Sequence, residues 1–155
     1  MAQRKQAFEL HPRHGLGAIL FGTQREQVHQ IIPDGHQLDS EKRPRAWPFA
    51  LYREDSFFGG HLLITFDDQC RVFSIHAVAC DDFALLCRGA DLFRTPCEEV
   101  LDLIDPNLRD ERCERSGQDF VYPSLELHLV CHDNRLESVA AGRAGYCSQV
   151  LQRQP

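Results

Sequence analysis

GAILFGTQREQVHQII, residues 17–32, returns in modified form as GADLFRTPCEEVLDLI, residues 89–104. Half of the aligned positions are identical, which is far more than unrelated segments share. The identical pairs are Gly17/Gly89, Ala18/Ala90, Leu20/Leu92, Phe21/Phe93, Thr23/Thr95, Glu26/Glu98, Val28/Val100 and Ile32/Ile104. The repeat indicates that one folding unit is used twice in the chain.

Each copy carries a signal for the start of a helix. Thr23 and Glu26 are spaced as in a capping box, in which the hydroxyl accepts a first-turn amide and the carboxylate reaches back, and so are Thr95 and Glu98. Pro96 falls at the expected first helical position, where a missing amide hydrogen costs nothing. Apolar residues then recur three and four apart, which places them on one helix face. They are Val28, Ile31 and Ile32 in the first copy and Cys97, Val100, Leu101 and Ile104 in the second, with Pro33 and Pro106 ending the two helices.

Short strand signals follow each helix. The β-branched and aromatic runs separated by Asp and Asn turn residues predict a hairpin in each copy. The strands are expected at residues 49–52, 61–66 and 71–78 in the first copy and at 120–122, 125–130 and 135–141 in the second. The helices repeat after 72 residues and the hairpins after 64, so the first copy carries a longer connection, which we place at residues 40–48.

These elements predict an α+β fold in a single domain, residues 1–155, made of two repeats at about 1–80 and 81–155. A helix over three or four antiparallel strands has too small a core to be stable alone. We therefore expect the two copies to form one continuous antiparallel sheet with both helices on one face. The other face of that sheet must be polar, covered or used.

The stretch GLGAILFGTQREQV, residues 15–28, resembles the opening of small bacterial proteins built from a helix and an antiparallel sheet. They include the small lipoproteins of outer-membrane β-barrel assembly, the tandem-repeat β-lactamase inhibitor proteins and uncharacterised immunity-type proteins. The resemblance implies a concave sheet formed by the two copies. It also implies inhibition of a partner protein as the activity.

Charge separates the two halves. Residues 1–80 are neutral, and residues 81–155 carry the whole net charge of -6. Nucleic acid is therefore an unsuitable partner, because phosphates require a basic surface, whereas a basic protein is compatible with this charge. The residues predicted to bind the partner are the carboxylates of the second helix region and two aromatic anchors that precede the first hairpin: Glu99, Asp102, Asp105, Asp110, Glu111, Trp47 and Tyr52.

The sequence contains no recognisable catalytic, cofactor or metal motif. The seven cysteines are odd in number and lack a C-x-x-C pair, so we expect reduced thiols in a cytoplasmic protein with no membrane segment. His128 and His132 of HLVCH would point to the strand face opposite Cys131, which disfavours a shared zinc ion. The acid pairs Glu54/Asp55, Asp67/Asp68 and Asp81/Asp82 are assigned mainly to turns and strand positions.

The prediction is a non-enzymatic binding module, specifically a bacterial immunity protein that neutralises a cognate basic toxin. Two alternatives remain. One is a small-ligand-binding or enzymatic α+β protein that uses the open sheet face, and the other is a structural homodimer that pairs exposed sheet edges.

Overall fold

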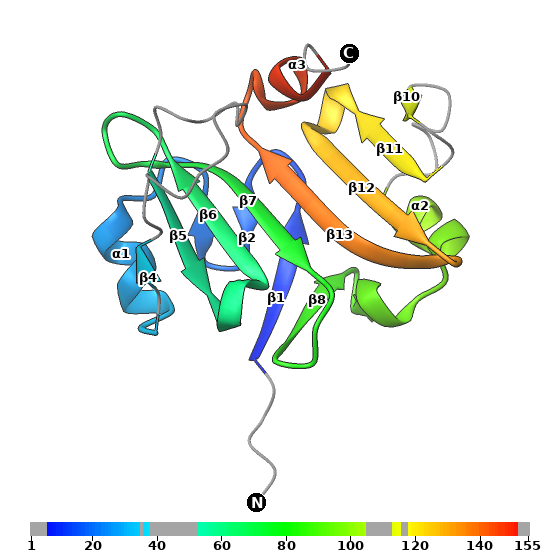
Figure 1. Ribbon diagram of the computed structural model, residues 1–155, viewed down its shortest axis with the longest axis horizontal. Helices are drawn as coiled ribbons and strands as arrows, with labels where there is room; N and C mark the ends of the chain where they lie inside the picture. The colour runs from blue at the N-terminus through cyan, green and yellow to red at the C-terminus, as the bar shows by residue number, and fades with distance from the viewer. Residues whose placement is uncertain (1–5, 35, 38–52, 105–112, 116–117, 152–155) are drawn as a thin grey trace, which may run out of the picture.

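The computed structural model describes residues 6–34, 36–37, 53–104, 113–115 and 118–151, and it shows an α+β fold with two sheets (Figure 1). The first half of the chain contains β1 (Gln6–His11), β2 (Gly15–Leu16), β3 (Ile19–Leu20), α1 (Arg25–Ile31), β4 (His36–Gln37), β5 (Arg53–Phe57), the 3-10 turn η2 (Phe58–Gly60), β6 (Leu62–Phe66) and β7 (Val72–Val78). The second half contains β8 (Phe83–Cys87), β9 (Ala90–Asp91), η3 (Leu92–Arg94), α2 (Cys97–Ile104), β10 (Cys113–Arg115), β11 (Asp119–Tyr122), η5 (Pro123–Leu125), β12 (Leu127–His132), β13 (Arg135–Gly142) and α3 (Tyr146–Leu151).

The larger sheet joins the two halves. Its eight strands are antiparallel in the order β10-β11-β12-β13-β7-β6-β5-β4, so the same succession of elements runs outward from the central β13–β7 pair. Both predicted hairpins are confirmed as β6–β7 and β12–β13. The strand predicted at residues 49–52 and the long connection at residues 40–48 lie outside the described residues.

The prediction of one continuous sheet is wrong, because the strands before the helices form a second sheet in the order β3-β2-β1-β8-β9. β1 lies at its centre, antiparallel to β2 and parallel to β8. β2, β3 and β9 are only two residues long, too short to give a period-2 pattern in the sequence.

The core lies between the two sheets, with β1, β2 and β8 behind β7 and β13 in Figure 1. Side chains of both sheets meet there. They are Leu10, Leu16 and Leu85 from the smaller sheet and Ile75, Ala77, Val139 and Ala141 from the larger one. Val28 of α1 and Val100 of α2 are fully buried in the same cluster, which confirms the predicted apolar faces.

The helix starts differ from the predicted capping boxes by one residue. α1 begins at Arg25 after Gln24, which has an extended backbone conformation. The Gln24 backbone amide donates a hydrogen bond to Gln27 Oε1 at 3.4 Å. Thr23 is instead held against β7, because its carbonyl oxygen accepts the Val72 amide. In the second half Pro96 precedes the helix, and the Thr95 hydroxyl donates to the Asp91 carbonyl oxygen.

The junction between helix and hairpin is the same in both halves. The Arg25 amide donates to the Cys70 carbonyl at 2.9 Å, and the Cys97 amide donates to the Asn134 carbonyl at 3.0 Å. Cys70 and Asn134 both adopt a left-handed backbone conformation in these turns. The repeated sequence therefore encodes a repeated set of contacts, and Arg25 and Cys97 occupy matching positions.

The prediction that the cysteines are reduced is wrong for one pair. Cys97 at the start of α2 and Cys131 of β12 form a disulfide with a Cα–Cα distance of 6.4 Å. Cys97 lies on the apolar face of α2 and Cys131 on the core side of β12, so helix packing brings the two thiols together. Sequence spacing could not reveal the pair, because the partners are separated by 34 residues in different elements.

Removing this disulfide should destabilise the protein. The double variant Cys97→Ser/Cys131→Ser is expected to lose about 3 kcal/mol of unfolding free energy, because the loop it opens is of intermediate length. Urea unfolding followed by far-UV circular dichroism measures the loss. Cys70→Ser, at a half-buried free thiol, is the control and should change stability little. An unfolding midpoint that is insensitive to reductant would contradict the assignment.

Candidate functional site

The outward face of α2 carries three acidic residues. Glu98, Glu99 and Asp102 are exposed on this face, and we call these three residues the acidic face. Glu99 and Asp102 were predicted to bind a partner, and the structure places them one helical turn apart. The other predicted partner-binding residues lie outside the described residues: Asp105, Asp110, Glu111, Trp47 and Tyr52.

The inner face of α2 is fixed to the rest of the protein. Cys97, Val100, Leu101 and Ile104 are buried, and the disulfide ties the first helical residue to β12. Because the helix is already held in place, it loses little conformational entropy when a partner binds. The acidic face is therefore presented on a pre-organised element.

The matching face of α1 carries one exposed carboxylate, Glu26, which corresponds to Glu98. Gln27 and Gln30 stand where α2 has Glu99 and Asp102, and both glutamines are exposed. α1 nevertheless buries Val28 and keeps the same junction with its hairpin. α1 thus packs in the same way without carboxylates at the positions that match Glu99 and Asp102.

A buried polar cluster lies under α1. Asp55 of β5 has no exposed side-chain surface, and it accepts two hydrogen bonds from Arg25, at 2.7 Å from Nε and 2.8 Å from Nη2. His29, one turn further along α1, places Nε2 2.6 Å from Asp55 Oδ2. The hydrogen bond with Asp55 raises the pKa of Arg25 above its ordinary value, against the opposing effect of burial. These contacts attach α1 to the sheet.

In the second half, α2 is attached to the sheet without a buried ion pair. Asp55 is the cross-strand partner of Ile64, and Phe120 is the cross-strand partner of Leu129. Asp55 and Phe120 therefore occupy matching positions in the two halves. Arg25 and His29 correspond to Cys97 and Leu101. One helix is therefore held by a buried ion pair and the other by apolar contacts and a disulfide. We interpret the Arg25–His29–Asp55 cluster as structural, because equivalent positions without ionisable groups do the same work.

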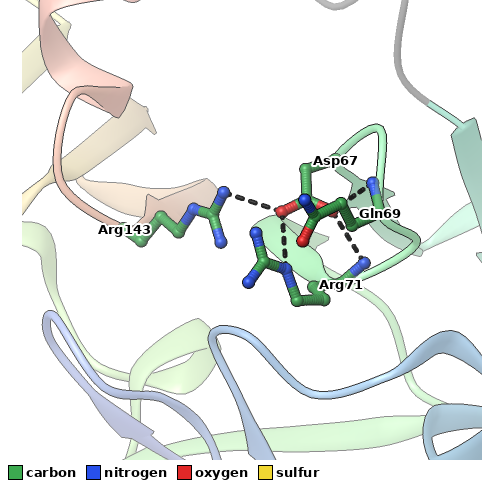
Figure 2. A network of polar contacts seen from close by, with 4 residues as sticks. All are labelled: Asp67, Gln69, Arg71 and Arg143. Atoms are coloured by element: carbon green, nitrogen blue, oxygen red, sulfur yellow. Dashed lines mark hydrogen bonds and ion pairs between the residues drawn. The ribbon is translucent and has the colours of Figure 1, made fainter.

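The turn between β6 and β7 carries a second polar network (Figure 2). Asp67 is buried and accepts the Gln69 and Arg71 amides, both at 2.9 Å, as expected for an Asp in a turn. Its Oδ2 also accepts Arg143 Nη2 at 2.8 Å and Arg71 Nε at 3.2 Å. Since Arg143 follows β13, the network links the two halves of the chain. Burial raises the pKa of Asp67, but these hydrogen bonds outweigh burial and hold the pKa below its ordinary value.

The outer face of the larger sheet holds two histidines. Ala140 of β13 is the cross-strand partner of both His76 and His128, so these side chains lie on one face with a methyl group between them. Burial lowers the pKa of His76, and the charge of His128 lowers it further. α3 covers one end of this face, where Tyr146 and Cys147 pack on Val121 and Ala140.

The ligand residues considered in HLVCH separate in the structure. Cys131 is engaged in the disulfide, His128 Nε2 lies 3.4 Å from Asp119 Oδ1, and His132 is exposed. A different group, His61, Cys80 and Asp82, is brought together, which sequence reasoning missed. The one signal was the predicted β6–β7 hairpin, which necessarily brings the residues flanking its open end close together.

A shallow groove of about 370 Å³ lies beside this group. It is lined by residues of both charge signs, and Arg94 Nε lies 3.7 Å from Asp91 Oδ2 within it. Its lining residues are Ala79, Cys80, Asp81, Asp91, Phe93, Arg94 and Arg135.

Among the described helices, none is long and apolar enough to cross a membrane.

No protein-family model matches the chain, and neither a curated protein nor a solved structure matches it.

Removing the buried carboxylate should be costly. Asp55→Ala is expected to destabilise the protein by about 3 kcal/mol or more, because it leaves Arg25 without its partner in a largely buried site. The triple variant Arg25→Met/His29→Leu/Asp55→Leu gives α1 an apolar contact like that of α2 and should recover most of the loss. Equilibrium urea unfolding measures both values. A triple variant as unstable as Asp55→Ala would contradict the structural interpretation.

The Asp67 network predicts a specific acid sensitivity. A folded-state pKa below the unfolded value of about 4 stabilises the native protein at neutral pH, and this contribution is lost as pH falls through the folded-state pKa. Asp67→Asn should therefore be less stable at pH 7 and should show a smaller loss between pH 5 and pH 3 than the wild type. Thermal unfolding across this range tests it, with the exposed neighbour Asp68→Asn as the control.

Proposed function

We propose that this protein is a non-enzymatic binding module that neutralises a basic protein, in the manner of a bacterial immunity protein, and that the acidic face of α2 forms part of the contact surface. The single observation that carries the proposal is the difference between the two helices. They occupy matching positions and bury matching apolar stripes, yet only α2 exposes a carboxylate at both outward positions compared, Glu99 and Asp102.

Charge on a rigid surface suits recognition of a basic partner. Complementary potentials raise association rates and select the partner, whereas most of the affinity comes from apolar anchors at the interface centre. The anchoring of α2 by four buried side chains and a disulfide lowers the entropy lost on binding.

The chain supplies its own control for a binding test. Glu99→Gln/Asp102→Asn and Gln27→Lys/Gln30→Lys both raise the net charge by two, but on opposite helices. The probe is the product of the gene immediately upstream, which this proposal expects to be a toxin, co-expressed and purified with the protein. We expect the α2 variant to reduce the association rate on the order of tenfold at low salt, with a smaller effect at high salt, and the α1 variant to leave it nearly unchanged.

Stopped-flow or surface-based kinetics at two salt concentrations measure these rates, and survival of cells that co-express the toxin gives a second readout. Equal effects of the two variants would show that net charge alone matters and would overturn the role of the acidic face. Failure of the wild-type protein to bind or protect would overturn the proposed function itself.

A further inference from the structure

A group of three potential metal ligands lies where the two halves of the chain meet. His61 directly precedes β6, and Cys80 and Asp82 belong to the segment of residues 79–82 that leads from β7 in the larger sheet to β8 in the smaller one. The Val78 amide donates to the His61 carbonyl at 2.8 Å, and the Ala79 amide donates to the Glu137 carbonyl at 2.8 Å. Backbone contacts therefore fix both segments without any metal.

The side chains of this group converge. One ligand atom from each of His61, Cys80 and Asp82 lies within 4.8 Å of the other two. Cys80 is a free thiol and half-buried, whereas Asp82 is exposed. A search of the described residues for three or more His, Cys, Asp or Glu side chains with converging ligand atoms finds this group.

The hydrogen bonding of His61 prepares the ring for a metal. Its Nδ1 lies 2.9 Å from the Phe58 carbonyl oxygen. A carbonyl only accepts, so Nδ1 carries the hydrogen, and the neutral ring keeps its lone pair on Nε2. In a metal-binding histidine, the ring nitrogen that does not bind the metal usually donates its hydrogen to a group such as a backbone carbonyl.

We propose that His61, Cys80 and Asp82 form a zinc site with water as the fourth ligand. Imidazole, thiolate and carboxylate together suit Zn²⁺ rather than Ca²⁺ or Mg²⁺, which prefer oxygen ligands. Zinc bonds of about 2.0–2.3 Å in a tetrahedron bring donor atoms to within about 3.5 Å of one another, so the side chains need to close by about 1 Å. Binding deprotonates the Cys80 thiol, and the proton passes to solvent.

The location gives such a site a structural consequence. The metal would tie the start of β6 to the segment that connects the two sheets, and would hold the crossover between the halves. Ligation of the folded state alone stabilises it in proportion to the free metal concentration. Zinc should therefore raise the melting temperature of the full-length protein.

Cobalt substitution tests the ligand set directly. The metal-free full-length protein, with its disulfide intact and under argon, is titrated with Co²⁺ and then with Zn²⁺. We expect one equivalent of Co²⁺ to give visible bands of tetrahedral coordination and a near-ultraviolet thiolate charge-transfer band. One equivalent of Zn²⁺ should remove them. Cys80→Ser should abolish the thiolate band, and His61→Gln and Asp82→Asn should weaken metal affinity by about tenfold or more.

Controls separate this site from adventitious binding. Cys70→Ser and His132→Gln change another half-buried free thiol and an exposed histidine, and should leave the spectrum, stoichiometry and affinity unchanged. Since Asp82 is exposed, Asp82→Asn should fold normally, which keeps the test valid if Cys80→Ser is unstable. A thiolate band that survives in Cys80→Ser, an affinity unaffected by Asp82→Asn, or the absence of stoichiometric binding would overturn the proposal.

Discussion

The pairing of β7 with β13 is the constraint on which the rest of the structure depends. The two strands are the last of their respective halves, and their antiparallel register unites two four-stranded units into one sheet. Neither unit has a core large enough to be stable alone, and the joined sheet provides one surface for both helices and for the smaller sheet. The Asp67–Arg143 hydrogen bond crosses the same boundary, so polar and apolar contacts both hold the halves together.

β1 completes this arrangement, although the described residues of the second half contain no equivalent strand. It lies between β2 and β8, antiparallel to one and parallel to the other, so β2 and β8 run in opposite directions on its two sides. The two sides of the smaller sheet thus run in opposite directions about β1, as the two halves of the larger sheet do about the β7–β13 pair. A strand from outside the repeat thus fills the space between β2 and β8.

The sequence revealed the elements with long local patterns and missed those defined by distant partners. The repeat predicted both helices, their buried stripes and the hairpins, because periodicity and turn residues are local. β2 and β9 are too short to show periodicity, and Gln24 became the helix cap because β7 engages Thr23. The Cys97–Cys131 disulfide and the Arg25–Asp55 pair each join a helix to a strand, and only packing decides such partners. For the same reason the acidic residues were visible in the sequence, while the group of His61, Cys80 and Asp82 was not.

The duplication also separates what the fold needs from what it permits. A feature present in both copies, such as the amide of the first helical residue bonded to the hairpin turn, is needed for the architecture. A feature present in one copy must be explained by its own surroundings. Beneath the helices the difference is an exchange of one attachment for another, because Arg25 with Asp55 and Cys97 with Cys131 each fix a helix to its sheet. On the outer faces the two helices also differ, because exposed glutamines of α1 stand where α2 has Glu99 and Asp102. This difference in charge at matching, exposed positions is the basis of the proposal that α2 contacts a basic partner.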